Sequence, residues 1–129
     1  MKSIFTGFFL FVASLLGCKQ QSGDFKSLNV EEFETLLLST KVQRLDVRTQ
    51  AEYAEGHVPG SVNLNVLEEK YFTEMSDSLL DKTRPVALYC RSGRRSKRAA
   101  IILSGKGYEV YELAKGFSSW EAAGKPIEK

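Results

Sequence analysis

The segment best suited to chemistry is a cysteine followed by glycine and arginines. Cys90 begins the run Cys-Arg-Ser-Gly-Arg-Arg-Ser, so that one thiol, one glycine and three arginines lie close together. The thiolate is the nucleophilic form of cysteine, and nearby positive charge favours it over the thiol. A buried, inert cysteine at a strand end would not account for the residues that follow it. The spacing therefore predicts a nucleophile directed at a small anionic electrophile.

The charge distribution supports a local anion site. The chain has 129 residues, with 18 Lys and Arg against 16 Asp and Glu, a net charge of +2. Residues 84–98 contain six basic residues and no acidic one, and the remaining residues carry a net charge of −4. One basic segment in an otherwise acidic chain indicates an anion site, not a surface for nucleic acid.

Composition limits the other classes of site. With 43% hydrophobic and 26% charged residues, the chain has the composition of a globular protein, and its length suits one domain. Cys18 and Cys90 are its only cysteines, and it has one histidine. These are too few for a disulfide framework or a four-ligand structural zinc site.

The N-terminus has the pattern of an export signal. After Lys2, residues 4–16 are mostly apolar, which is too short to span a bilayer but fits the core of a secretory signal. Leu15-Leu16-Gly17-Cys18 resembles the bacterial lipobox. That resemblance implies removal of residues 1–17, lipidation of Cys18 and a polar tether over 18–24. We expect a lipid-anchored protein of the bacterial cell envelope, facing the periplasm or the exterior; the alternative is an ordinary secretory signal with an incidental cysteine.

Strands and helices alternate along the rest of the chain. Asn29 and Glu32 form a capping-box pattern that predicts the start of a helix. Strands separated by helices imply parallel pairing and a layered α/β sandwich. We expect helices at 30–38, 52–55, within 65–81, and at 96–103 and 117–123, and strands at 42–47, 61–64, 86–90 and 109–113.

This alternation places the thiol at a favourable point. Cys90 ends an almost unbroken apolar strand, and a turn and a helix follow it. In open α/β sheets, ligands bind beyond the carboxyl ends of the strands. Gly93 permits the loop to turn its amides towards the sulfur, and the helix N-terminus adds partial positive charge. We therefore expect the pKa of Cys90 to fall below the reference value of about 8.5 for a thiol.

Residues 25–129 resemble a single rhodanese domain, and three stretches carry the resemblance. The first contains Leu-Asp-Val-Arg (45–48), Glu-Tyr (52–53) and Gly-His-Val-Pro-Gly-Ser-Val-Asn (56–63), and the second is Tyr-Cys-Arg-Ser-Gly-Arg-Arg-Ser (89–96). The third contains Leu113, Gly-Phe (116–117), Trp120, Gly124 and Pro126; Lys115 departs from the paired glycines common in the family. The resemblance implies a three-layer α/β sandwich with a mostly parallel central sheet flanked by helices.

The resemblance also implies a reaction. A sulfurtransferase of this family would accept sulfane sulfur from a small anionic donor such as thiosulfate, forming a persulfide on Cys90. A thiol, or cyanide in assays, would then take the outer sulfur, with no cofactor needed. The residues implied in binding the donor and the persulfide are Arg91, Ser92, Gly93, Arg94 and Arg95.

Other polar residues receive structural interpretations. Asp46 and Arg48 match a family pair near the active loop, and we expect an ion pair that supports the site. His57 lies in a turn that is structural in the family, and a preformed thiolate needs no general base. Lys97 and Arg98 are expected to be solvated.

Two alternatives belong to other functional classes. Cysteine-dependent phosphatases place an arginine six positions after the cysteine and commonly a histidine before it. Here Ser96 is the sixth residue, Arg95 the fifth, and Tyr89 precedes Cys90. The second alternative is a non-enzymatic, envelope-anchored persulfide carrier or binding module, which retention of the cysteine disfavours. We expect a monomer, because this fold needs no partner to complete its core.

Overall fold

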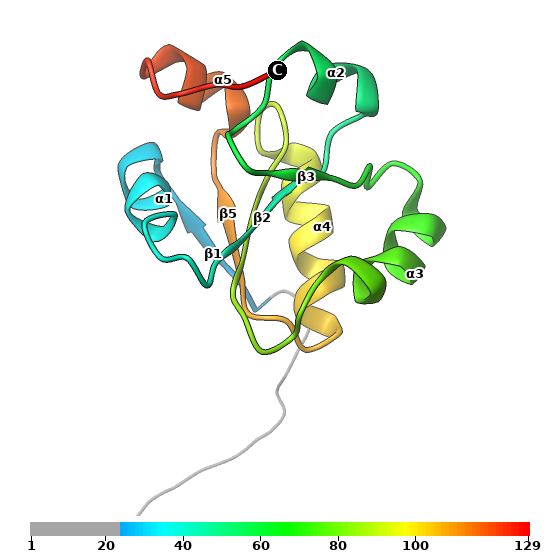
Figure 1. The fold of residues 1–129 in the computed structure, drawn as a ribbon. Coiled ribbons are helices and arrows are strands. Elements are labelled where there is room, and N and C mark those ends of the chain that lie inside the picture. Colours follow the sequence, from blue (N-terminus) through cyan, green and yellow to red (C-terminus); the bar gives the residue numbers. More distant parts are fainter. Residues whose placement is uncertain (1–23) are drawn as a thin grey trace, which may run out of the picture.

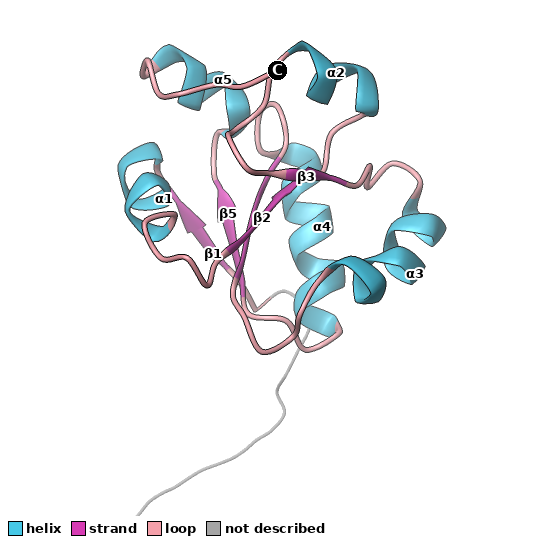
Figure 2. Cartoon of the chain, viewed as in Figure 1, coloured by secondary structure: helices cyan, strands magenta, loops and turns pink. Residues whose placement is uncertain are grey.

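A five-stranded parallel sheet forms the centre of the protein (Figures 1 and 2). The computed structural model describes residues 24–129, so the expected signal and Cys18 lie outside the described residues. The strand order is β1-β5-β4-β2-β3, and every adjacent pair is parallel. The strands are β1 (Lys26–Leu28), β2 (Gln43–Asp46), β3 (Val62–Asn63), β4 (Val86–Tyr89) and β5 (Val110–Leu113).

Helices cover both faces of this sheet, which gives the three layers expected. In Figure 1, α1 and α5 lie on one side, α3 and α4 lie on the other, and α2 sits near the carboxyl ends of the strands. The helices are α1 (Val30–Leu36), α2 (Gln50–Glu55), α3 (Glu69–Leu79), α4 (Arg94–Gly105) and α5 (Gly116–Ala122).

Strand β4 lies inside the sheet and contributes to both hydrophobic layers. All four of its residues are fully buried, as expected for a central parallel strand. Because successive side chains point to opposite faces, Leu88 packs with Leu103 of α4, whereas Tyr89 packs with Phe33 of α1 and Trp120 of α5. Burial on both faces therefore fixes the strand that ends at Cys90.

Local sequence signals account for several element boundaries. Asn29 and Glu32 form the expected reciprocal capping box at 2.9 Å in each direction, and Thr49 and Glu52 form a second one before α2. Helix α4 begins at Arg94, two residues earlier than expected, because Gly93 in the left-handed region turns the chain directly into the helix.

One strand is not predicted from the sequence. Strand β1 has three partly exposed residues, which give no periodic signal, and pairing with β5 orders them. The helix expected within 65–81 is α3, which begins at Glu69. Before it, the amides of Leu64 and Val66 donate to carbonyls of Asp46 and Val47, which continues the pairing along β2.

Candidate active site

Cys90 lies immediately after β4, at the carboxyl edge of the sheet, with 1% of its surface exposed. The amide of Gly93 donates to Cys90 Sγ at 3.1 Å, and the amides of Ser92 and Ser96 also hydrogen-bond with the sulfur. We call these three amides the amide cradle. Burial raises the pKa of the thiol, but hydrogen bonds with Ser96, Gly93 and Ser92 outweigh it and lower the pKa below its ordinary value.

The loop is held in shape by close backbone contacts with the segment that leads into α5. Gly93 has φ of 104°, and a Cβ there would lie 2.0 Å from the carbonyl oxygen of Ala114. Gly116 has φ of 68°, and a Cβ there would lie 2.4 Å from the Arg91 backbone. The amide of Phe117 donates to the carbonyl of Cys90 at 2.7 Å. Glycine is therefore required on both sides of this contact.

The departure from paired glycines at Lys115 leaves the loop intact. Lys115 has φ of −113° and ψ of 13°, a conformation open to any L-amino acid. Only its neighbour Gly116 adopts a positive φ and touches the active loop. Of the paired glycines common in the family, only the second, Gly116 here, is required for steric reasons.

The three arginines of the loop differ in their surroundings. Arg95 makes a bidentate ion pair with Glu52 of α2, at 2.7 and 2.9 Å, and Arg91 Nε lies 3.3 Å from the same carboxylate. Hydrogen bonding from Arg95 is the main reason that the pKa of Glu52 lies far below its usual range. Arg94 is exposed and makes no side-chain contact within residues 24–129. The charge most open to a donor is thus on Arg94.

Asp46 and Arg48 form a buried ion pair at 2.7 Å, with 0% and 1% of their side chains exposed. Arg48 also donates to the carbonyl of Gly56 at 2.7 Å and stacks over Phe117, 4.3 Å from the ring centroid. The pair therefore joins the end of β2 to α5, whose N-terminus supports the Cys90 loop. It acts on the site through packing.

His57 joins two distant segments of the chain. Its ring stacks on Tyr53 with centroids 3.7 Å apart, and Nδ1 lies 2.9 Å from the Tyr53 carbonyl oxygen. Its backbone pairs with Glu128 through two hydrogen bonds of 2.9 Å. These contacts give His57 a structural role, because its backbone holds the C-terminal segment against α2.

A buried polar group behind the loop was not anticipated from the sequence. Glu112 of β5 is fully buried and accepts a hydrogen bond from Ser96 Oγ at 2.6 Å. Lys97 is exposed, as expected, and its ammonium group also lies 3.2 Å from Glu112 and 3.0 Å from the carbonyl of Gly93. A single glutamate in a short strand gives no sequence signal for such a contact.

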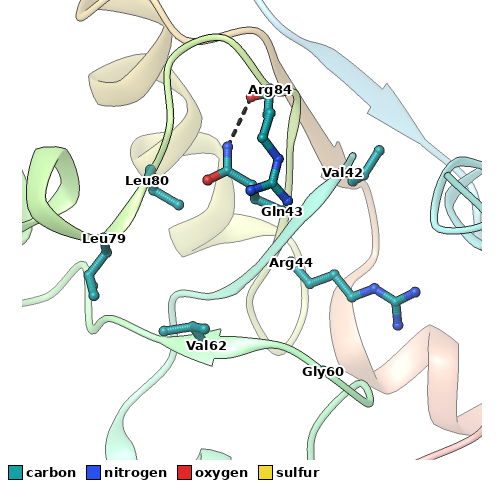
Figure 3. Close-up of a pocket in the computed structure, with 8 residues that line it drawn as sticks. All are labelled: Val42, Gln43, Arg44, Gly60, Val62, Leu79, Leu80 and Arg84. Carbon is teal, nitrogen blue, oxygen red and sulfur yellow. Dashed lines mark hydrogen bonds between the residues drawn. The ribbon is translucent and has the colours of Figure 1, made fainter. Parts of the chain in front are cut away.

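A separate cavity of about 260 Å³ lies between β2, β3 and the end of α3 (Figure 3). Gln43 donates to the carbonyl of Arg84 at 3.0 Å there. Arg44 points away from Arg84 in Figure 3, and its guanidinium donates to the carbonyls of Pro59 and Leu37. No thiol or carboxylate is among the residues that line this cavity.

Residues 29–123 match the family of the Rhodanese-like domain. The chain belongs to this family. It is 33% identical to the thiosulfate sulfurtransferase GlpE of Shewanella oneidensis over 100 residues, which cover 77% of this chain and 95% of that protein. It is also 37% identical to a sulfurtransferase of Allochromatium vinosum over 84 residues, covering 64% and 75% of the two chains.

Solved structures show the same rhodanese-like architecture. A rhodanese-related protein of Thermoplasma volcanium superposes with a TM-score of 0.70 at 25% identity, covering 81% of this chain and 98% of that one. The rhodanese-like domain of an Anabaena protein gives a TM-score of 0.69 at 24% identity, covering 79% and 77%. The rhodanese-like fold expected from the three sequence stretches is confirmed.

Neither a membrane span nor a metal cluster is found in the described part of this rhodanese-like chain. Over residues 24–129, no helix combines the length and the apolar character needed to cross a bilayer. Over the same residues, no three His, Cys, Asp or Glu side chains are grouped as metal ligands would be.

Proposed function

We propose that this protein is a sulfurtransferase that carries sulfane sulfur from a small anionic donor, such as thiosulfate, to a thiol through a persulfide on Cys90. The observation that supports this most is the sulfur of Cys90 in its amide cradle, with Gly93 N–H at 3.1 Å. Neutral donors directed at one sulfur stabilise the thiolate and also suit an anionic outer sulfur. The family and its sulfurtransferase relatives support the same chemistry.

In the first half-reaction, the Cys90 thiolate attacks the outer sulfur of thiosulfate. A bond forms between Cys90 Sγ and that sulfur, while the sulfur–sulfur bond of thiosulfate breaks and its electron pair leaves with sulfite. One thiolate and one thiosulfate dianion become one persulfide anion and one sulfite dianion, so charge balances and no proton is needed. This agrees with the structural, non-catalytic position of His57.

In the second half-reaction, an acceptor thiolate attacks the outer sulfur of the persulfide. The Cys90 thiolate then leaves with the electron pair of the bond that breaks, and the acceptor becomes a persulfide. Cyanide accepts the same sulfur as thiocyanate. Cys90 is the only cysteine among residues 24–129, so a thiol acceptor for this domain comes from another molecule.

Donor attraction is assigned mainly to Arg94. Arg91 and Arg95 share the carboxylate of Glu52, whereas Arg94 is exposed without a side-chain partner in the described region. An unpaired guanidinium attracts an oxyanion more strongly than one already neutralised by a carboxylate. Ser92 and Gly93 contribute through their backbone amides.

The test is thiocyanate formation from thiosulfate and cyanide by the purified full-length chain, compared with Cys90→Ser. We expect turnover by the wild-type chain and none above background by the variant. Mercaptopyruvate and glutathione persulfide, tested in parallel, identify the preferred donor. Equal rates for the two proteins would exclude Cys90 from the reaction.

The persulfide-carrier alternative predicts a different outcome of the same experiment. A carrier would gain one sulfur on Cys90 after incubation with thiosulfate, as measured by peptide mass spectrometry, yet would release it only to a specific partner. Rapid transfer to both cyanide and small thiols supports the enzyme. A loaded persulfide that neither acceptor removes would favour the carrier.

We also propose that lipid on Cys18 anchors the protein in the bacterial cell envelope, after removal of residues 1–17. The support is the apolar stretch at 4–16 and the lipobox-like Leu15–Cys18, both outside the described region. The described chain starts at the amino ends of the strands, opposite the Cys90 loop (Figure 1), so an anchor attached there would direct the site away from the membrane. Mass analysis of the mature N-terminus tests this, and an unmodified Cys18 in cells would overturn it.

A further inference from the structure

The carboxylate of Glu112 lies directly behind the loop that holds Cys90. It sits in β5, next to β4 in the sheet, and is fully buried. Three groups surround it: Ser96 Oγ at 2.6 Å, Lys97 Nζ at 3.2 Å and the hydroxyl of Ser27 in β1. A buried charge needs such partners. The sulfur-transfer steps above do not use this carboxylate.

Ser96 connects this carboxylate to the reactive sulfur. Its side chain is fully buried, and its hydroxyl reaches both Glu112 and the sulfur of Cys90. A hydroxyl has one proton to donate and two lone pairs that accept. It can stabilise a thiolate on Cys90 only when its proton is directed to the sulfur. When the proton is directed to Glu112, the oxygen presents a lone pair to the sulfur instead.

The geometry favours donation to Glu112. A contact of 2.6 Å is typical of a hydroxyl donating to a carboxylate, which is among the strongest acceptors in a protein. The sulfur of Cys90 already accepts hydrogen bonds from the amide cradle. The carboxylate and the sulfur therefore compete for one hydroxyl proton, and the ionised carboxylate is the stronger acceptor.

We propose that Glu112 is a positioning residue that draws the Ser96 hydroxyl proton away from Cys90 and so sets how strongly the sulfur is stabilised as a thiolate. This inference deepens the proposed function and rests on it for its kinetic consequence. The amide cradle stabilises the thiolate in either orientation of the hydroxyl. The Glu112–Ser96 pair withholds one further hydrogen bond from the sulfur. The pair acts through Ser96 and touches neither donor nor acceptor.

The kinetic consequence follows from the two roles of one sulfur. Cys90 is the nucleophile towards the donor and the leaving group towards the acceptor. A thiolate of lower pKa is a weaker nucleophile but departs faster. Withholding one donor therefore favours persulfide formation at the expense of sulfur release.

Most other charged groups around the loop have ionic partners of their own. Arg95 on α4 and Arg91 in the loop face Glu52 of α2, and Asp46 at the end of β2 faces Arg48. Lys97 on α4 faces Glu112 itself, and Arg94 is exposed. A change confined to Glu112 and Ser96 leaves the ion pairs of Glu52 and Asp46 in place.

The experiment measures alkylation of Cys90 by iodoacetamide across pH, in full-length protein, read by mass spectrometry of the Cys90 peptide. In Glu112→Gln, the amide keeps the size of the side chain and leaves the Ser96 proton free to point at the sulfur. We expect the midpoint of the pH profile to fall by about one unit, the effect of one additional hydrogen bond to an anion. In Glu112→Gln with Ser96→Ala, most of that fall should disappear.

Two single variants serve as controls. Ser27→Ala removes another partner of Glu112 but keeps its contact with Ser96, so the midpoint should stay at the wild-type value. Ser96→Ala alone removes the hydroxyl group. This variant still tests the proposal if Glu112→Gln does not fold. We expect its midpoint to stay or to fall. A rise of about one unit would show that Ser96 donates to the thiolate, which overturns the proposal.

Two further results for Glu112→Gln would overturn the proposal. An unchanged midpoint in Glu112→Gln, or an equal fall with and without the Ser96 hydroxyl, overturns the proposal, because Glu112 would then act by charge alone or not at all. Alkylation needs no sulfur donor, so this result stands even if sulfur transfer fails. If transfer occurs, rapid-mixing measurements at a pH above both alkylation midpoints should show slower sulfite release and faster persulfide decay in Glu112→Gln.

Discussion

At the scale of single residues, the sulfur of Cys90 is surrounded by neutral donors, while two of the neighbouring arginines face a carboxylate. The sequence shows a thiol among positive charges, and it is natural to attribute thiolate stabilisation to the arginines. In the structure, the sulfur is stabilised by the backbone amides of Ser92, Gly93 and Ser96, and Glu52 engages Arg91 and Arg95. The arginines thus supply positive charge near the site, whereas hydrogen bonds to the sulfur lower the pKa of the thiol.

This division predicts different effects for two adjacent arginines. Arg94→Ala should raise KM for thiosulfate several-fold and leave the free energy of unfolding unchanged, because Arg94 is exposed and unpaired within the described region. Arg95→Ala should cost about 1 kcal/mol of stability, because it breaks a bidentate, partly buried ion pair with Glu52. Steady-state kinetics and urea unfolding of both variants measure this; a stability loss in Arg94→Ala equal to that in Arg95→Ala would contradict it.

The same ion pair predicts a dependence of stability on pH. The pKa of Glu52 is lowered in the folded state, mainly by hydrogen bonding from Arg95. A lowered pKa adds stability that is complete above the unfolded-state pKa of about 4.3 and is lost as pH falls below it. The urea midpoint of the wild-type chain should therefore exceed that of Glu52→Gln at pH 7, and the difference should shrink in acid.

Glu52→Gln is a suitable probe because glutamine can replace glutamate in the capping box of α2. The matched control is Glu55→Gln, at the exposed end of the same helix and outside any ion pair of residues 24–129. Its urea midpoint should follow the wild-type value throughout. A difference between wild type and Glu52→Gln that persists unchanged in acid would show that the ion pair is not its source.

At the scale of elements, the active loop depends on α5 as much as on the strand and helix that flank it. The N-terminal amides of α5 donate to the carbonyls of Cys90 and Arg91, and Gly116 allows the two segments to touch. The helix after Cys90 could be predicted from the sequence, since a loop glycine and a helical pattern follow the cysteine. The approach of α5 could not, because it depends on the place of β5 beside β4.

Glycine substitutions test this packing. Gly93→Ala and Gly116→Ala should each cost about 3 kcal/mol or more and abolish sulfur transfer, because a Cβ would overlap backbone atoms at 2.0 and 2.4 Å. Gly107→Ala is the control: φ there is 100°, but no atom lies within 4 Å of the added Cβ. It should cost about 1 kcal/mol and retain activity. Urea unfolding and the thiocyanate assay distinguish the two classes, and equal losses at all three sites would contradict the steric argument.

At the scale of the whole molecule, the chain order of the strands differs from their order in the sheet. Strand β1 comes first in the chain yet lies at one edge beside β5, which comes last. This edge strand also brings Ser27 to the carboxylate of Glu112. The first described residues therefore belong to the folded unit, although no periodic pattern marks them.

Two truncations test the contribution of β1. A chain that begins at Asp24 should unfold at the same temperature as the full-length chain, because it keeps the five described strands and both described hydrophobic clusters. A chain that begins at Asn29 should unfold at a lower temperature, because β5 loses one of its two neighbouring strands and Glu112 loses Ser27. Thermal unfolding monitored by circular dichroism measures both; equal melting temperatures would show that β1 contributes no stability.

By itself, the sequence determined the candidate nucleophile, the glycine of its loop, the alternation of strands and helices and the capping box at Asn29. These features are local, since they arise from neighbouring residues and from periodicity along one segment. Only the tertiary structure decided which groups meet around the sulfur. Glu52 and Arg95 are 43 positions apart, Ser96 and Glu112 are 16 apart, and Ser27 and Glu112 are 85 apart. Contacts between such positions depend on the order of strands in the sheet, which packing of the whole chain establishes.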